Sequence, residues 1–392
     1  MSQPPGFTDS ANKNLVCKLH KSLYGLKQAP RAWFDKLTSV LLKLGFNKSK
    51  CDPSLFIFST STVTIFMLVY VDDIILTGNS PSMLQKFVTQ LNDIFSLKDL
   101  GALDYFLGIE VKSLSQGKLL LSQAKYITDL LTKVKMEDSK SISTPMIGGQ
   151  QLAKEGTPFD DPTLYRSVVG ALQYATITRP EIAFSVNKVS QFMCSPMEEH
   201  WKVVKRILRY LKGTVGHGLV FSPAKHIDPF NLTAFTDADW ASDPNDRRST
   251  SAACIYLGPN LVSWWSKKQL LVARSSTEAE YRALAQAITE VLWIQSLLKE
   301  LKVPLNTPTV LCDNQSTVAL SHNLVLHSRS KHMELDIFFV REKVLNKSLN
   351  VSHIPAQHQF ADVLTKALSP KRFLLLRSNL NVVDPSTLFH PP

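Results

Sequence analysis

Apolar residues recur at helical spacing early in the chain and then give way to strand-like runs. Between residues 29 and 44 they recur every three or four positions, with a proline in the first turn and a glycine after the last, which predicts a helix. β-rich runs follow at 54–60 and 62–78. The second run is interrupted by Asp72 and Asp73 between apolar flanks. This pattern predicts two buried strands joined by a tight turn, with both acids at its tip.

The next segments alternate between periodic and aperiodic sequence. Residues 82–95 have helical spacing, and residues 104–123 read as a hairpin that turns near Gly117. Residues 139–162 are rich in Ser, Thr, Gly, Pro and Asp without periodicity, which predicts a linker. Helical spacing returns at 165–212, with a break at a Thr-Arg-Pro-Glu sequence whose proline can open a new helix.

The end of this helical region is strongly basic. Residues 201–225 hold six basic residues and no acidic one, namely Lys202, Lys205, Arg206, Arg209, Lys212 and Lys225. Apolar residues line the opposite helix face, which favours a solvated face on a packed helix. A helix that follows phosphates is the alternative.

A new pattern begins after residue 229, where strands come first and then alternate with helices. Strands are expected at 232–240, 252–258, 261–268, 309–313 and 350–354, with a long helix at 277–301, a shorter one after each of the last two strands, and a peripheral tail after residue 370. This order predicts one α/β layer fold.

Charge and cysteine content narrow the choice of partner and compartment. A formal charge of +11 favours a polyanionic partner, because Lys and Arg release condensed counterions from phosphates. The five cysteines are scattered without CxxC spacing, so neither a disulfide framework nor a zinc site is indicated.

The longest apolar stretch, 63–76, is too short to span a bilayer, and the start lacks a secretory leader pattern. We expect a soluble intracellular protein, cytoplasmic or nuclear, without a membrane partner.

Carboxylates in the last third of the chain stand where a sheet and its helices can bring them together. The candidate metal ligands are Asp237, Glu280, Asp313 and Asp362. Each has a structural alternative as well, such as a favourable place near a helix start for Glu280 or a helix N-cap for Asp362. Their joint placement at strand ends and on helix faces favours a metal site over four separate structural roles.

Such a site suits phosphodiester hydrolysis. Two divalent ions about 4 Å apart can activate water and stabilise the leaving oxygen, and Mg²⁺ prefers carboxylate and water ligands, with Mn²⁺ as a possible substitute. His353 and His358 precede Asp362 by nine and four residues. An imidazole there could shuttle protons, although an ordinary surface or core histidine fits equally well.

A second candidate site surrounds the paired aspartates near the N-terminus. Tyr70 precedes the pair, and the upstream segment supplies side chains able to meet phosphates and stack on bases, including Lys27, Gln28 and Arg31. A turn with two solvated aspartates is the alternative for this short string.

The residues together resemble the Pol polyprotein of copia-type retrotransposons, in its reverse transcriptase and ribonuclease H portion. The resemblance is carried in family order over nearly the whole chain by KSLYGLKQAPRAW, YVDDIILTG, TDADWASDPNDRRSTSA, ARSSTEAEYRAL and HIPAQHQFADVLTK. It implies an α/β protein with a partial palm and thumb at 1–138, a linker and helical connection at 139–226, a ribonuclease H-like domain at 227–370 and a tail at 371–392.

The resemblance also implies roles for the candidate residues. Asp72 and Asp73 would bind polymerase metals, and Gln28 would lie near the incoming nucleotide. Two Mg²⁺ ions on the four later carboxylates would cut the RNA strand of an RNA–DNA hybrid, recognised by backbone shape and 2′-hydroxyls. RNA template and DNA primer would be the further partners.

One departure from the family affects the expected activity. The family's polymerase uses a third metal-binding Asp upstream of the QPPGF segment, at which this chain starts. We therefore expect lost RNA-directed DNA polymerase activity and retained ribonuclease H activity. The alternative is a catalytically inactive nucleic-acid-binding remnant of a decayed element.

Overall fold

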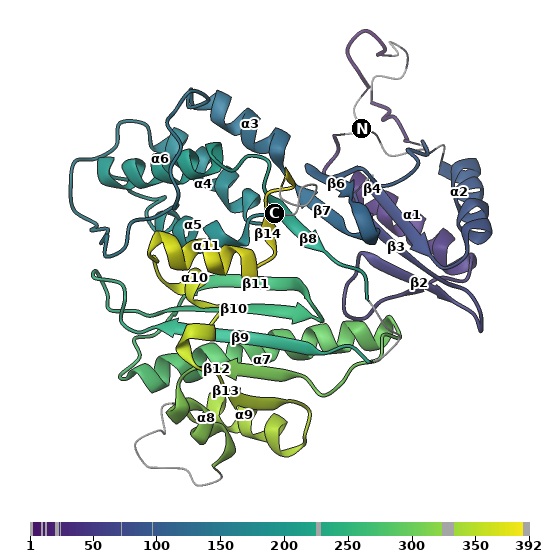
Figure 1. Ribbon diagram of the computed structural model, residues 1–392. Coiled ribbons are helices and arrows are strands. Elements are labelled where there is room, and N and C mark those ends of the chain that lie inside the picture. Colours follow the sequence, from purple (N-terminus) through teal and green to yellow (C-terminus); the bar gives the residue numbers. More distant parts are fainter. Residues whose placement is uncertain are drawn as a thin grey trace. The chain divides into compact units, whose positions relative to one another are not determined.

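The computed structural model describes residues 3–8, 11, 14–19, 23, 25–71, 73–95, 97–224, 229–323 and 333–386. The chain separates into two compact units, Met1–Gly101 and Ala102–Pro392, whose elements Figure 1 labels.

The first unit is an antiparallel sheet with two helices. Its elements are α1 (Ala29–Lys43), β1 (Asn47–Lys48), β2 (Leu55–Ser59), β3 (Thr64–Tyr70), β4 (Asp73–Gly78) and α2 (Pro81–Phe95). The strands pair in the order β1-β2-β3-β4. Side chains alternate along β3, so that Ile65, Met67 and Val69 are buried and pack in one core with Leu37 and Leu41 of α1. The helix predicted at 29–44 is confirmed, and so are the two strands beside the paired aspartates. The prediction that both strands are buried is wrong for β4, whose side chains are half-buried or exposed.

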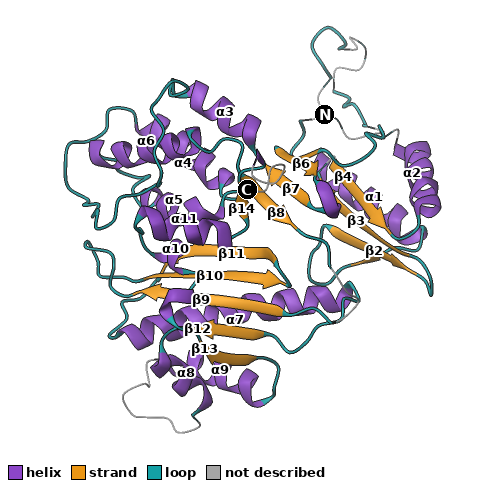
Figure 2. Cartoon of the chain, in the orientation of Figure 1, coloured by secondary structure: helices purple, strands orange, loops and turns teal. Residues whose placement is uncertain are grey.

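The second unit contains two further sheets and most of the helices (Figure 2). Its strands are β5 (Tyr105–Phe106), β6 (Ile109–Ser113), β7 (Leu119–Ser122), β8 (Gly218–Phe221), β9 (Leu232–Asp239), β10 (Thr250–Leu257), β11 (Asn260–Lys268), β12 (Thr309–Cys312), β13 (Asn350–His353) and β14 (Val382–Val383). Its α-helices are α3 (Ala124–Lys133), α4 (Pro162–Ala175), α5 (Ala183–Ser190), α6 (Glu198–Lys212), α7 (Ser276–Glu300), α8 (Gln315–His322), α9 (Glu334–Leu345), α10 (Asp362–Thr365) and α11 (Pro370–Asn379). Short 3₁₀ turns are η1 (Ser115–Gly117), η2 (Pro180–Ile182) and η4 (Ala356–His358).

The sheet β11-β10-β9-β12-β13 positions the candidate site. In this sheet β10 pairs antiparallel with both β11 and β9. β12 pairs parallel with both β9 and β13. Both faces are covered, because Ala234 packs in the core that contains Leu284 of α7, and its neighbour Phe235 packs in the core that contains Leu364 of α10. Among the described helices, including the long α7, none is both long and apolar enough to cross a membrane.

The chain after residue 370 is not peripheral, so that prediction is wrong for residues 370–383. Phe373, Leu376 and Leu380 recur at helical spacing and are buried in the core of the second unit. Val382 then pairs with Leu219, which adds β14 to the sheet β14-β8-β7-β6-β5. Burial of this apolar stripe fixes the segment to the fold.

The compact units also differ from the expected segmentation, which placed a boundary at residue 138. Residues 119–121 pair with residues 219–221, and α3 packs against α6, so the segment 102–138 belongs to the second unit. The expected linker between α3 and α4 contains no helix or strand. The other predicted boundaries remain proposals.

Candidate metal centre

Asp237 and Asp313 lie at the same edge of the central sheet. β9 and β12 run parallel with Thr236 paired to Cys312, and the two aspartates follow these paired residues directly. Carboxyl ends of parallel strands are where α/β sheets commonly place functional groups. Asp237 is 2% exposed, so its carboxylate is held inside the protein.

Glu280 reaches this edge from the start of α7. The Ser275 side chain caps the helix by accepting from the backbone N–H of Glu278. One turn later, Glu280 Oε1 accepts a hydrogen bond of 3.1 Å from the backbone N–H of Ala238, and its Oε2 lies 3.7 Å from Cys312 Sγ. The helix start is thereby tied to both strands.

Asp362 approaches from the opposite face, on the short helix α10. Lys366, one turn later, lies with Nζ 2.8 Å from Asp362 Oδ1 and 3.3 Å from Asp237 Oδ2. The Thr365 hydroxyl donates to Asp237, and Arg372 Nη2 lies 3.3 Å from Asp362 Oδ2. A single lysine thus joins two of the predicted carboxylates.

The pKa shifts show that the acids act on one another. Burial, followed by repulsion from Asp237 and Asp313, raises the pKa of Glu280 to about 9. Burial also raises the pKa of Asp237 to about 6, against the lowering effect of Lys366 and with a further rise from Asp362. Burial opposes the charge of Lys366, yet Asp237 and Asp362 raise its pKa above the ordinary value. Four carboxylates and one ammonium therefore form a single electrostatic cluster.

The donor set fits a hard divalent cation. Ligand atoms of Glu280, Cys312 and Asp313 lie within 4.8 Å of one another, and the oxygens of carboxylates are what Mg²⁺ prefers. Burial, and then the charge of Glu280, raises the pKa of the Cys312 thiol, so this side chain stays protonated and is a poor ligand. The carboxylates are the groups suited to hold Mg²⁺.

Two other acids of the region have different surroundings. Glu278 accepts a 2.8 Å hydrogen bond from the backbone N–H of Arg274 and forms a 2.9 Å ion pair with Arg282, which is a structural role at the helix start. Asp239 is half-buried near Lys366 and Lys188, and burial raises its pKa despite both lysines.

The predicted histidines lie close to the site in the fold but on the surface. His353 ends β13 and pairs in register with Cys312, which places it at the same sheet edge as Asp313. Its side chain is exposed, and so is that of His358 in η4. The geometry leaves their roles as predictions.

The predicted residues of the first unit are exposed around its sheet. Tyr70 pairs with Asp73 across a turn at Val71, whose φ of 53° is uncommon for a β-branched residue. Asp72, the other predicted polymerase ligand, lies outside the described residues. Lys27, Gln28 and Arg31 are also exposed, at the start of α1. Their contacts with nucleic acid stay predictions.

Lys366 and Thr365 were missed by the sequence reasoning. The one available signal was the spacing of Lys366 four residues after Asp362, which puts two opposite charges on one helix face. The contact of both residues with Asp237 depends on tertiary packing of α10 on β9 and has no local signature.

Comparison with known proteins identifies the family through sequence. Residues 1–148 match the family model of reverse transcriptase (RNA-dependent DNA polymerase). The chain is 48% identical over 390 residues to a retrovirus-related Pol polyprotein from transposon RE1 of Arabidopsis thaliana, covering 98% of this chain and 26% of that polyprotein. It therefore spans about a quarter of the length of this relative.

Two further matches cover most of the protein compared. A putative transposon Ty5-1 protein of Saccharomyces cerevisiae is 32% identical over 294 residues, covering 74% of this chain and 94% of the yeast protein. Among solved structures, the N-terminal RNase H domain of a Mycobacterium tuberculosis protein aligns with 38% of this chain and 97% of its own, at 13% identity and a TM-score of 0.26. At so low a score, the family assignment rests on sequence alone.

Proposed function

Since the chain belongs to the Pol polyproteins of copia-type retrotransposons, we propose that its second unit hydrolyses the RNA strand of RNA–DNA hybrids with two bound Mg²⁺ ions. The family supplies nucleic acid as the substrate class, and the carboxylate cluster supplies the chemistry.

The observation that carries the proposal is the convergence of Asp237, Glu280, Asp313 and Asp362 from two strands and two helices. The raised pKa values of Asp237 and Glu280 show that the acids repel one another in a buried place. Buried carboxylates that lose stability by mutual repulsion are characteristic of functional sites rather than of packing.

Each residue has a distinct task in this proposal. Bound Mg²⁺ would supply activation of a water molecule and stabilisation of the leaving oxygen. Asp237, fixed by Thr365 and by the sheet, would be the central ligand, with Glu280, Asp313 and Asp362 around it. His353, exposed at the same edge, would hold or release a proton near the leaving group. The 2′-hydroxyl and the helix shape would distinguish RNA from DNA.

The competing function is nucleic-acid binding without catalysis. Asp237→Asn separates the two, because it removes a central ligand charge while keeping the size of the side chain. We expect hybrid cleavage to fall by at least about a hundredfold, as metal ligation is lost, with hybrid affinity largely kept. Cleavage of a labelled hybrid and of matching RNA and DNA duplexes in Mg²⁺ provides the measurement.

Asp129→Asn is a matched control, since Asp129 is exposed on α3 of the same unit. Equal cleavage by both variants, or none by the unaltered chain, would contradict the proposed nuclease.

A further inference from the structure

A basic hollow lies between α6 and the segment that precedes α4. It has a volume of about 420 Å³, and its lining includes Lys202, Lys205, Arg206, Arg209, Glu199 and Gln150. The lining therefore has four positive charges and one negative charge, and the negative charge, that of Glu199, forms an ion pair with Lys202. The lysines are exposed, as expected for a solvated helix face, and together with the two half-buried arginines they line a concave surface.

The two arginines are held in place by the neighbouring segment. Arg206 Nη2 donates a 2.9 Å hydrogen bond to Thr144 Oγ1, and Arg209 Nε donates one of 2.7 Å to the backbone oxygen of Lys140. Burial, and then repulsion from Arg209, lowers the pKa of Arg206. Positive charges fixed close together are stabilised by an anion that binds between them.

Two polar atoms of the hollow have unmet hydrogen-bonding capacity. Arg206 Nε and Gln150 Oε1 are both buried and have no hydrogen-bond partner within the described part of the chain. Buried polar atoms normally find partners, so these two atoms of lining residues are available to a bridging water.

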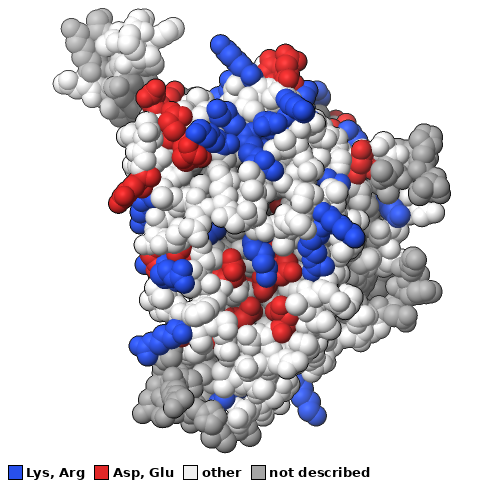
Figure 3. Space-filling view, turned by 60° about the vertical axis from the view of Figure 1, so that its left-hand side comes forward, with Lys and Arg blue, Asp and Glu red and all other residues white. Residues whose placement is uncertain are grey.

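A second hollow shares a lining residue with the basic hollow and is lined by Lys366, which contacts two carboxylates of the cluster. It has a volume of about 230 Å³, and its lining includes Asp239, Lys188, Lys366 and Gln150. Lys366 contacts Asp237 and Asp362, while Gln150 lines both hollows. The basic hollow and the carboxylate cluster are therefore each adjacent to this second hollow. Figure 3 shows Lys and Arg side chains around a group of acidic side chains on one face.

We propose that the basic hollow binds the sugar–phosphate backbone of the nucleic acid whose strand lies at the carboxylate cluster. The inference rests on the proposed nuclease function and adds a binding surface to it. A duplex carries regularly spaced phosphates, so it can lie on the carboxylate cluster and on Lys202, Lys205, Arg206 and Arg209 at the same time. Backbone contacts of this kind position the substrate without reading its sequence.

The test is the double substitution Lys202→Gln and Lys205→Gln. Both side chains are exposed, and an exposed ion pair such as that of Lys202 with Glu199 contributes little to stability. Affinity of the full chain for a labelled RNA–DNA hybrid is measured in Ca²⁺ at several salt concentrations. Loss of two phosphate contacts should reduce the slope of log affinity against log salt by about two and weaken binding roughly tenfold. DNA duplex binding should weaken to a similar extent.

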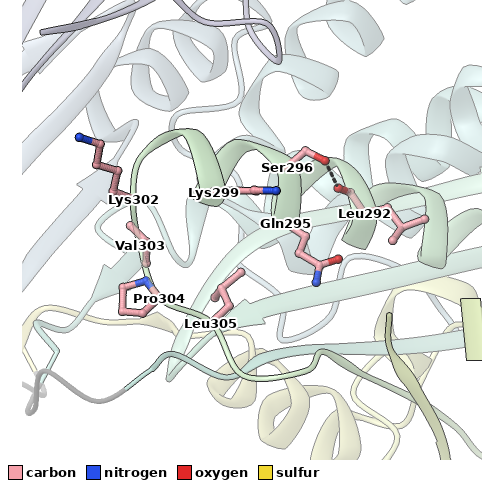
Figure 4. A pocket seen from close by; sticks show the side chains of 8 residues that line it. All are labelled: Leu292, Gln295, Ser296, Lys299, Lys302, Val303, Pro304 and Leu305. Carbon is pink, nitrogen blue, oxygen red and sulfur yellow. Dashed lines mark hydrogen bonds between the residues drawn. The ribbon is translucent and has the colours of Figure 1, made fainter. Parts of the chain in front are cut away.

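Lys299→Gln with Lys302→Gln is the matched control. Both lysines are exposed and line a different hollow at the end of α7, shown in Figure 4. Lys299 lies roughly 29 Å from Glu280 along the helix. If the two double variants have the same affinity and salt slope, the basic hollow is not a backbone site. The affinity measurement is independent of cleavage. If the Lys202 and Lys205 substitutions weaken binding but the unaltered chain does not cleave the hybrid, only the proposed nuclease function is contradicted.

Discussion

Lys366 Nζ lies 3.3 Å from Asp237 Oδ2 and also contacts the carboxylate of Asp362. The lysine supplies a positive charge to two carboxylates that would otherwise repel each other, and it does so at the position where a cation is expected in the proposed nuclease. In the proposed nuclease, Lys366 and a divalent ion would therefore compete for the same oxygens.

Lys366→Met is expected to lower the stability of the metal-free protein and to strengthen its binding of a divalent cation. Loss of the two ion pairs should cost about 1–2 kcal/mol in the free energy of unfolding, since the side chain is 38% exposed and water screens part of the interaction. Stabilisation by Mg²⁺ should then be larger than in the unaltered chain, because two oxygens become free to bind it. Thermal unfolding in chelator and across a Mg²⁺ titration measures both effects.

Lys366→Arg keeps the charge and is the control for lost packing. It should resemble the unaltered chain in chelator. If Lys366→Met and Lys366→Arg respond identically to Mg²⁺, the lysine does not compete with the ion.

Glu280→Gln is expected to remove hybrid cleavage and to stabilise the metal-free protein at high pH. Because the folded-state pKa of Glu280 is about 9 and its ordinary value is 4.5, the folded protein binds more protons between these values. Its contribution to stability is fully present below pH 4.5 and is lost as the pH rises through 9. Gln does not titrate, so the variant's unfolding midpoint in chelator should exceed that of the unaltered chain at pH 8–9 and approach it near pH 5.

Glu290→Gln, farther along α7, is the control for an acid outside the cluster. A variant of Glu280 that is less stable than the unaltered chain at pH 9, in the absence of metal, would show that repulsion in the cluster is not a cost to folding.

Local patterns were sufficient to predict the elements that carry the site. The strand-like run at 232–240 and the apolar stripe after Glu280 indicated the strand and the helix, because side chains two apart on a strand and three or four apart on a helix share a face. The convergence of the four acids was an expectation from their strand ends and from resemblance, and their geometry agrees with it.

Contacts between distant segments could not be predicted in this way. Nothing near Lys366 indicates that its ammonium meets Asp237, since that depends on how α10 packs on the sheet. β8 likewise pairs with both β7 and β14, which come from distant segments of the chain. The sequence of such short strands does not indicate which strand each one pairs with. The spacing of Phe373, Leu376 and Leu380, after a Ser-Pro sequence that can start a helix, was the signal that the tail is a packed helix.

The buried pair Arg179 and Glu181 connects the helical layer and provides a test of its stability. Both side chains are fully buried, with Arg179 Nη2 2.7 Å from Glu181 Oε1, and Tyr210 donates a 3.1 Å hydrogen bond to the same oxygen.

Glu181→Gln leaves the guanidinium without a counter-charge, which should lower the free energy of unfolding by about 3–5 kcal/mol in urea titrations. Glu137→Gln, on an exposed side chain, should change it by less than about 0.5 kcal/mol. The double change Arg179→Met and Glu181→Leu removes both charges and should recover much of the loss, because desolvation of the two ions opposes their attraction. If the double variant is less stable than Glu181→Gln, the hydrogen bonds of Arg179 to Thr214 contribute more than the charge pair, and the burial argument is wrong.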